Sequence, residues 1–345
     1  MNIAVALSGG VDSACAALLL LDAGHSVTGL HMKLSDRDSD SWDQVRAVGD
    51  SIGIAVKLVD LSKSFQKHVV DYFVSEYNSG RTPSPCPRCN RQIKMTLLAE
   101  RALELGADRL STGHYARIVS KDDRSALFKG SDSSRDQSYF LFMLTQKILS
   151  NLIFPLGGLT KVEVRRIAEL RGLPVSSTED SQELCFVPDN TYVEFLLEQG
   201  TEAKPGLILD EDGNVIGKHP GIIFFTVGQR RGLGVCGPEP LYVLAINHER
   251  HEIVVGRKNR TLVSGIVIDQ LSFVSGKTPD WNNRFTIKVR STSREATCKI
   301  REIGSSSLTI SFDSPQSGVA PGQAAVLYKE DEVIGGGWIL SAVKF

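Results

Sequence analysis

Apolar segments alternate with segments of helical periodicity through the first half of the chain. Apolar runs at Ile3–Leu7, Ser26–Met32 and Ala55–Val59 each have the length of a buried strand. Between them, apolar residues recur at helical spacing over about Val11–Ala23 and Trp42–Ile52. Strands that alternate with helices are typical of a parallel sheet covered by helices. The pattern therefore predicts an α/β fold with a Rossmann-like parallel sheet.

The pattern changes character near residue 200. Before that point, helical periodicity recurs at about Ser64–Tyr77 and Gln92–Leu105, and the second segment leads into an apolar run at Arg109–Thr112. Beyond it, short β-branched segments separated by Gly, Pro, Asn or Asp favour antiparallel barrels or sandwiches. These segments are Gly206–Leu209, Gly221–Thr226, Leu241–Asn247, Glu252–Val255, Arg284–Arg290, Ser307–Phe312 and Ala324–Tyr328.

Two changes in composition divide the chain into three expected units. Helical periodicity ends near residues 195–205, and a weaker change lies near Lys258–Val263. We therefore expect an α/β unit over residues 1–198, a central β-rich unit over 199–260 and a C-terminal β-barrel unit over 261–345.

Composition narrows the class of protein without identifying its partner. The chain has 345 residues, 41% of them hydrophobic, and a formal net charge of -1, so a nucleic-acid site would have to be a local patch. No apolar run approaches the roughly 18 residues of a membrane span, and the first residues lack a basic leader, so we expect a cytoplasmic protein. Six cysteines without a secretion signal do not indicate a disulfide scaffold.

The hexapeptide Ser8–Ser13, of sequence SGGVDS, lies between the first predicted strand and helix. Its glycines let backbone N–H groups approach an anion, and the helix N-terminus and two serine hydroxyls add donors, so the turn suits a phosphate. Asp12 would repel phosphate unless a divalent cation lay between them, and we assign it to Mg²⁺. An ordinary Gly-rich turn with Asp12 near the helix cap is the alternative interpretation.

Two familiar nucleotide motifs, G-x-x-x-x-G-K-[ST] and G-x-G-x-x-G at the first turn, are absent from the sequence. What remains resembles the PP-loop of the ATP pyrophosphatase superfamily. That resemblance implies ATP binding and transfer of AMP to a carbonyl oxygen. It does not separate thiolation from amidation.

The segment Arg81–Lys94 carries Cys86 and Cys89 at C-x-x-C spacing, with three prolines, four basic residues and no acid. Flanking arginines and a helix start near Arg91 predict lowered thiol pKa values and hence reactive thiolates. Half of a zinc ribbon is the alternative, but no second C-x-x-C or paired histidine follows at a suitable spacing.

The sequence as a whole resembles the tRNA 2-thiouridylase family, through a series of motifs in one order. The matching segments are Ser8–Ser13, Gly80–Lys94, Ser111–Tyr115, Asp136–Leu141, Asp180–Phe186 with its Leu184–Phe186 core, and Thr226–Gly234. In this family the C2 carbonyl oxygen of the wobble uridine is adenylated, and sulfur then attacks that carbon.

The resemblance implies roles for individual residues. Cys89 matches the catalytic cysteine of the C-x-x-C segment, and Cys185 matches the cysteine that receives sulfur as a persulfide. Formation of a Cys89–Cys185 disulfide would release the terminal sulfur of that persulfide. The family's ATP site matches Ala6, Leu7, Ser8, Gly9, Gly10, Val11, Asp12, Ser13, Met32 and Gly113. Its tRNA contacts match Ser84, Pro85, Cys86, His114, Arg135, Asp136, Gln137, Arg290 and Gln323. Implied partners are tRNAs for Lys, Glu and Gln and a persulfide donor or relay protein, with no membrane.

The chain also departs from the family pattern. Some members have Asp where this chain has Cys86, so Cys86, Cys89 and Cys185 offer three thiolates that could hold a [4Fe–4S] cluster instead of carrying a persulfide. Ser291 replaces an aromatic residue that often follows Arg290. The sequence leaves both sulfur routes open.

Basic residues in the β-rich half are consistent with RNA binding. Six of them lie between Arg284 and Arg301 against the single acid Glu295, and Arg230 and Arg231 lie in a Gly-rich turn. A solvated strand face is the alternative for the first group. For the whole protein, the alternatives are a PP-loop amidotransferase-like ligase, which needs no catalytic cysteine, and an RNA-binding scaffold without turnover.

Overall fold

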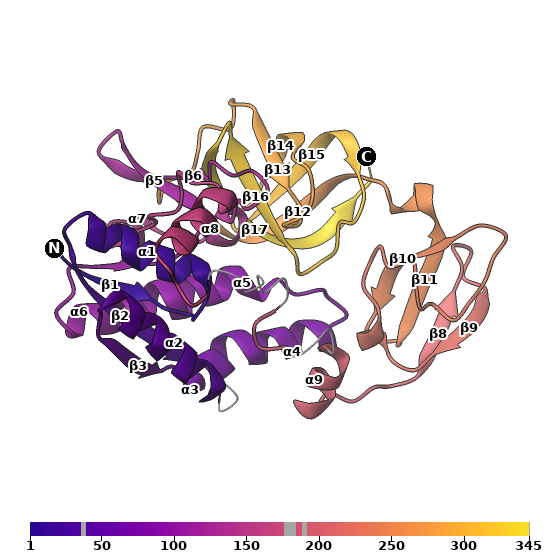
Figure 1. Ribbon diagram of the computed structural model, residues 1–345. Coiled ribbons are helices and arrows are strands. Elements are labelled where there is room, and N and C mark those ends of the chain that lie inside the picture. Colours follow the sequence, from indigo (N-terminus) through magenta and orange to yellow (C-terminus); the bar gives the residue numbers. More distant parts are fainter. Residues whose placement is uncertain (36–38, 176–183, 188–191, 345) are drawn as a thin grey trace.

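The computed structural model describes residues 1–35, 39–175, 184–187 and 192–344. The N-terminal part is a five-stranded parallel sheet in the order β3-β2-β1-β4-β7, and Figure 1 labels β1, β2 and β3 of it. Its strands are β1 (Asn2–Ala6), β2 (Ser26–Lys33), β3 (Val56–Asp60), β4 (Arg109–Ser111) and β7 (Leu152–Ile153). The predicted Rossmann-like α/β fold is confirmed.

Helices cover both faces of this sheet. Successive apolar side chains of the central strand point to opposite faces, so each face has apolar surface to bury. Ile3 and Val5 of β1 pack with α1 (Val11–Asp22) and α2 (Ser39–Ile52), whereas Ala4 faces α6 (Leu98–Glu104). The other helical elements are α3 (Ser62–Phe65), η2 (Gln66–Val70), α4 (Asp71–Asn78), α5 (Pro85–Arg88), η3 (Cys89–Leu97), η4 (Ser138–Leu141), α7 (Gln146–Leu149), α8 (Lys161–Leu170) and α9 (Tyr192–Glu198).

The predicted helical segments at 64–77 and 92–105 are helical, with one difference. Each contains a stretch of π-helix, η2 in the first and η3 in the second. In η3 the Thr96 hydroxyl donates to the Arg91 carbonyl five residues earlier, at 2.6 Å. Single π-helical turns are rare and frequently lie at functional sites.

The central part is a four-stranded sheet in the order β10-β11-β8-β9. Its strands are β8 (Gly206–Leu209), β9 (Val215–His219), β10 (Leu241–Asn247) and β11 (Glu252–Arg257). The prediction of a strand at 221–226 is wrong, because that segment forms the 3₁₀ turn η5 (Ile222–Phe224). Ile222, Ile223 and Phe225 are all buried, and a strand would have turned adjacent side chains to opposite faces.

The C-terminal part is a closed six-stranded barrel in which β12 also pairs with β17. Its strands are β12 (Val263–Phe273), β13 (Phe285–Lys288), β14 (Ala296–Ile303), β15 (Ser307–Gln316), β16 (Ala324–Lys329) and β17 (Glu332–Val343); the turn η6 (Lys258–Thr261) precedes them. Closure removes the exposed edges of the sheet. The predicted β-rich class of both later parts is confirmed.

A hairpin from the N-terminal half extends the barrel sheet, which the sequence pattern did not predict. It consists of β5 (Ala116–Lys121) and β6 (Arg124–Lys129), and β6 pairs with β17 through Phe128 and Glu332. Glu332 is buried and accepts hydrogen bonds from Lys121 Nζ at 2.7 Å and from Arg124.

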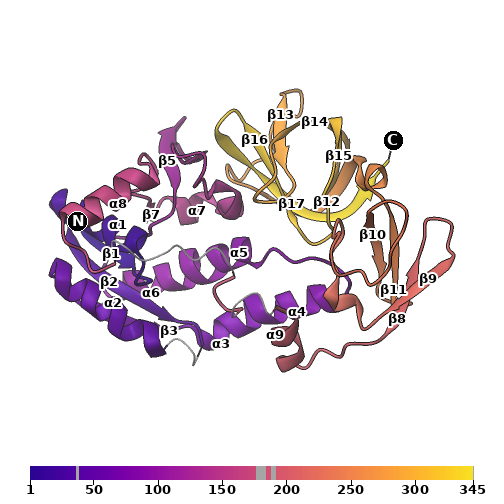
Figure 2. The same ribbon diagram turned by 45° about the vertical axis from the view of Figure 1, so that its right-hand side comes forward.

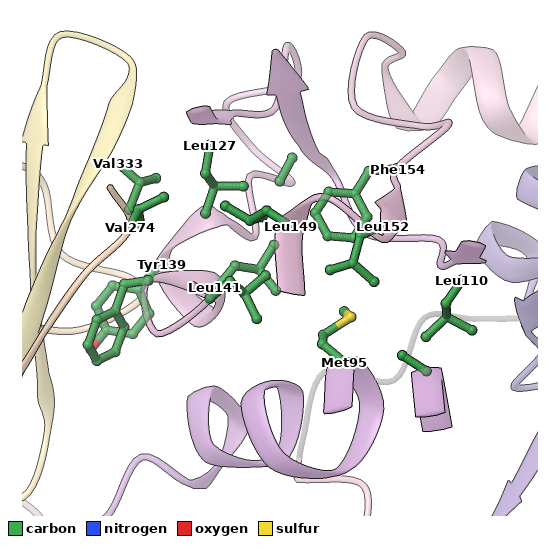
Figure 3. Close-up of a cluster of buried hydrophobic side chains, with 14 of the residues drawn as sticks. Met95, Leu110, Leu127, Tyr139, Leu141, Leu149, Leu152, Phe154, Val274 and Val333 are labelled. Carbon is green, nitrogen blue, oxygen red and sulfur yellow. The ribbon is translucent and has the colours of Figure 1, made fainter. Parts of the chain in front are cut away.

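One hydrophobic core joins the parallel sheet to the barrel. It combines Met95 from η3, Leu110 from β4, Leu127 from the hairpin, Tyr139 from η4 and Val333 from β17 (Figure 3). Each large buried side chain of this kind contributes about 1.5–3 kcal/mol. The barrel is therefore packed against the parallel sheet through this core.

A second core joins the helices to the central sheet. Phe73 of α4 and Phe195 of α9 pack with Ile208 of β8 and Val243 of β10. Figure 2 shows α4 and α9 lying between the parallel sheet and the four-stranded sheet. Among the described residues, no helix is both long and apolar enough to span a bilayer.

Replacing Glu332 by Gln tests the ion pairs between hairpin and barrel. Burial acts to raise the pKa of Glu332, but hydrogen bonds from Lys121 and Arg124 outweigh it and leave the pKa lowered. A carboxyl with a lowered folded-state pKa stabilises the fold above its unfolded-state pKa, and the contribution disappears as pH falls through the folded value. We expect Glu332→Gln to lower the free energy of unfolding by about 1–2 kcal/mol at neutral pH. Urea unfolding should show that this loss of unfolding free energy becomes smaller below about pH 4. An equal loss at neutral pH and below pH 4 would contradict the assignment.

Candidate active site

The fold brings two loops together where the strand order reverses. From β1 the chain continues to β2 on one side, and it later returns to β4 on the other. In parallel sheets, ligands bind at the carboxyl ends of the strands at such a switch point. A Cβ at Gly113, just after β4, would lie 2.8 Å from the backbone carbon of Asp12, so the two loops are in direct contact.

The turn after β1 is folded for anion binding. The Ser8 N–H donates to Ser13 Oγ at 3.2 Å, and Ser13 Oγ donates to the Gly10 carbonyl at 3.0 Å. Gly9 has a φ of +79°, a conformation that favours glycine. Gly10 at the N-cap of α1 supplies no side-chain acceptor, which leaves N–H groups of the first turn available for a phosphate.

A cavity of about 670 Å³ opens over this turn. Its volume suits a nucleotide. Of the residues predicted for ATP, those that line it are Leu7, Ser8, Gly9, Gly10, Val11, Asp12 and Met32. Ala6, Ser13 and Gly113 are not in its wall, although Ser13 is hydrogen-bonded within the turn and Gly113 packs against it.

Asp12 has partners that the sequence did not reveal. Its carboxylate accepts from Lys161 Nζ at 2.7 and 2.8 Å and from the Tyr115 hydroxyl at 2.7 Å. Lys161 opens α8, which begins with a capping box formed by Thr160 and Glu163. The capping box predicts the start of a helix from the sequence. It does not predict that Lys161 contacts Asp12, which lies 149 positions earlier in the chain. Lys161 therefore balances the charge that was predicted to face Mg²⁺.

A second cavity, of about 580 Å³, contains the cysteines. Cys86 lies in α5 and Cys89 begins η3, because Pro85 at the first helical position starts the helix after Ser84. Cys185 lines the same cavity but is exposed, whereas Cys89 is only 6% exposed. Cysteines that are about a hundred positions apart in sequence thus meet in one cavity.

The two cavities share part of their walls. Lys94, Gln137 and Cys185 line both of them, together with Phe65 and Phe186. A group held in the cysteine cavity would therefore adjoin a nucleotide held over the turn. Neither Lys94 nor Lys161 was assigned a role from the sequence, although Lys94 ends the basic segment that carries Cys86 and Cys89.

The predicted lowering of the thiol pKa values is wrong. Burial raises the pKa of Cys86 to about 11 and that of Cys89 to about 12, and the positive charge of Lys94 opposes this only in part. The flanking arginines point elsewhere. The Arg88 guanidinium lies 4.0 Å from the Tyr72 ring centre, and Arg91 donates to the Met143 carbonyl.

Lys94, in the shared wall, and His114, in the cysteine cavity, are the two buried basic groups next to the thiols. Burial acts to lower the pKa of Lys94, whereas negative charge on the cysteines acts to raise it, and the net pKa is raised. Burial and then Lys94 lower the pKa of His114 to about 3. His114 is therefore a neutral ring at physiological pH, and its Nδ1 lies 2.8 Å from Thr112 Oγ1.

The residues predicted to contact tRNA do not all lie together. Arg135 lines the nucleotide cavity, and Asp136 and Arg290 line neither cavity. The Asp136 carboxylate accepts from the N–H groups of Gly130 and Ser138, so it shapes its own loop. Those that line the cysteine cavity are Ser84, Pro85, Cys86, His114, Gln137 and Gln323. The motif residues 180–183 lie outside the described part of the chain.

Within the described residues, no group of three or more His, Cys, Asp or Glu side chains is arranged to hold a metal ion. Cys86, Cys89 and Cys185 share a cavity without forming such a group. No step is derived through a [4Fe–4S] cluster.

Family models match the chain in three consecutive stretches. The tRNA methyl transferase HUP domain matches residues 1–189, the tRNA methyl transferase PRC-barrel domain matches residues 194–257, and the aminomethyltransferase beta-barrel domain matches residues 263–339. Together these stretches cover most of the chain.

Relatives of known name match over nearly their whole length. The tRNA-specific 2-thiouridylase MnmA of Syntrophotalea carbinolica is 46% identical over 347 residues, 98% of this chain and 98% of that protein. The protein of the same name from Geobacter metallireducens is 44% identical, over 99% of this chain and 97% of its own. A solved U34-tRNA thiolase from Methanococcus maripaludis has 21% identity and a TM-score of 0.38, over 53% of this chain and 61% of its own. That last likeness is too slight to carry an argument.

Replacing Lys94 by Met tests its electrostatic role. Because Lys94 lowers the thiol pKa values of Cys86 and Cys89, its removal should leave less thiolate at a given pH. We expect alkylation of Cys89 by iodoacetamide to slow about tenfold at mildly alkaline pH, and its rise with pH to move upward. Lys57→Met, on an exposed position of β3, is the matched control. Equal rates in Lys94→Met and the wild type would show that Lys94 does not act on the thiols.

Proposed function

Because the chain belongs to the family of tRNA-specific 2-thiouridylases, we propose that it uses ATP to activate the C2 carbonyl of the wobble uridine in tRNA and replaces that oxygen with sulfur. The observation that carries this proposal is the wall shared by the nucleotide cavity and the cysteine cavity. An enzyme that adenylates a base and then thiolates the same carbon needs both sets of groups within reach of one atom.

In the first step ATP occupies the cavity over Ser8–Ser13, with its phosphates at the N-terminus of α1. The uridine enters the cysteine cavity beside Ser84, Pro85 and Cys86. Its C2 oxygen attacks the α-phosphorus, the bond to pyrophosphate breaks, and the base carries AMP on that oxygen. Mg²⁺ held by Asp12 would offset phosphate charge, and Lys161 offsets the charge of Asp12 itself.

In the second step Cys185 supplies sulfur as a persulfide. Its exposure supports this role, because a donor protein must reach the thiol that it loads. The terminal sulfur attacks C2 and AMP leaves with the former carbonyl oxygen. The Cys89 thiolate then attacks the inner sulfur of Cys185, which leaves the terminal sulfur on the base and forms a Cys89–Cys185 disulfide. Active protein prepared without iron would support this route, whereas activity that depended on bound iron would favour a cluster.

The remaining units present the RNA. We assign catalysis to residues 1–198 and positioning of the tRNA to residues 199–260 and 261–345, where Arg290 of the barrel contacts the RNA. The proposed substrates are the tRNAs for Lys, Glu and Gln, and the proposed location is the cytoplasm. A PP-loop ligase of the amidotransferase type is the second candidate, and it would need neither Cys89 nor Cys185. The placement of those cysteines beside the nucleotide cavity favours thiolation.

Two substitutions separate the proposed steps. Asp12→Ala should abolish tRNA-dependent AMP formation, because it leaves Lys161 uncompensated and removes the assigned Mg²⁺ ligand. Cys185→Ser should abolish 2-thiouridine formation while ATP binding stays within about twofold of wild type. Mass spectrometry of tRNA nucleosides and equilibrium ATP binding measure these effects. Full sulfur transfer by Cys185→Ser would refute its role, and unchanged activity of both Cys185→Ser and Cys89→Ser would favour the ligase.

A further inference from the structure

The barrel contacts the chain immediately before the cysteine helix, which is the helical run of α5 and η3 that carries Cys86 and Cys89. The Gln323 amide nitrogen Nε2 donates to the carbonyls of Thr82 and Pro83, each at 3.1 Å. The Thr82 N–H donates to the Pro321 carbonyl at 2.8 Å. Between these bonds, a Cβ on Gly322 would lie 2.9 Å from the Thr82 oxygen. The segment 321–323 therefore lies directly against 82–83.

A second set of contacts continues from the same place on the barrel. The Tyr139 hydroxyl donates to the Ala324 carbonyl at 2.8 Å and is hydrogen-bonded to the Ser84 side chain. Ser84 is the residue before α5, so this bridge reaches the first turn of the cysteine helix. Both partners are buried, which strengthens hydrogen bonds of this kind.

Arg88 anchors the other end of α5. Its guanidinium lies 4.0 Å from the ring centre of Tyr72 and 5.1 Å from that of Trp338 on β17. Its Nη2 donates to Gln270 Oε1 of β12 at 3.0 Å. A stacked, hydrogen-bonded arginine gives a directional contact that lysine would not reproduce. Arg88, which directly precedes Cys89, therefore contacts the barrel.

These contacts lie close to the thiols along the chain. Pro83 is three residues before Cys86, and α5 begins at Pro85. The helical run continues from α5 through η3 into α6, so the 82–83 segment fixes only its N-terminal end. A shift of the 82–83 segment would therefore displace the first turns of the run, which carry Cys86 and Cys89.

We propose that Gln323 is a positioning residue for the cysteine helix and that it acts through the carbonyls of Thr82 and Pro83. The proposal rests on the proposed thiolation and replaces the tRNA contact that the family resemblance implied for Gln323. The amide group has two N–H donors, and two backbone carbonyls occupy the donor side of Gln323. Because we assign RNA positioning to the barrel, this contact would also tie the placement of the RNA to that of the thiols.

The test compares Gln323→Met, which keeps the length of the side chain and removes its donors, with Gln316→Met. Gln316 is on β15 of the same barrel, and its amide bonds only to the nearby Ser314 carbonyl among its described contacts. We expect Gln323→Met to lower kcat for thiolation about tenfold, with the KM for tRNA within about twofold. Alkylation of Cys86 and Cys89, mapped by mass spectrometry, should accelerate by a similar factor. Gln316→Met should match the wild type in all three measurements.

Cys298, buried in the barrel core, reports whether the barrel itself has opened. If Cys298 becomes reactive in Gln323→Met, the same measurements are made with Gln323→Glu, whose carboxylate would face the two carbonyls at unchanged length. A raised KM for tRNA with unchanged kcat and unchanged alkylation would overturn the proposal and assign Gln323 to tRNA. Thiol reactivity is measured without tRNA, so a failure of the proposed function would leave this comparison intact.

Discussion

The ammonium group of Lys94 lies in the wall between two cavities, and its charge acts on the pKa values of Cys86, Cys89 and His114. A cation removed from water is costly unless negative groups compensate it. The groups that act on it here are the thiols of Cys86, Cys89 and Cys185, and a nucleotide bound as proposed would add negative charge in the other cavity. Since burial keeps Cys86 and Cys89 protonated at neutral pH, their ionisation is tied to the charge that faces them. In the proposed reaction, Lys94 would therefore couple the charge of the thiols to that of the nucleotide.

The position of the cysteines depends on the barrel, because the barrel makes extensive contacts with the α/β part. The core around Tyr139 and Leu127, the β6–β17 pairing and the contacts of Gln323 and Arg88 all cross the same boundary. Of these contacts, those of Gln323 and Arg88 lie at the two ends of α5, the helical turn that carries Cys86. The division of the chain into consecutive units follows the changes in sequence pattern. It does not account for this interface, in which residues of the first unit share a core and a sheet with the barrel.

Local signals in the sequence predicted much of the fold. The apolar runs predicted β1 and β2 and the helical spacing predicted α1 to within a residue or two, and the SGGVDS turn lies where the strand order reverses. What failed depends on tertiary contacts. The β5–β6 hairpin pairs with a strand some two hundred residues later, and Lys161 meets Asp12 across the fold. Burial raises the thiol pKa values, opposite to expectation, and Arg88 does not offset this because its guanidinium lies against Tyr72 and Trp338.

The central claim is that Cys89 and Cys185 serve one carbon atom beside one nucleotide. Oxidation of the two thiols with diamide in a Cys86→Ser background, followed by peptide mapping, tests it most directly. The account predicts an intramolecular Cys89–Cys185 disulfide as the main product, formed at a rate independent of protein concentration. Cross-links confined to other cysteine pairs or to pairs of molecules, with Cys89 left reduced, would contradict it.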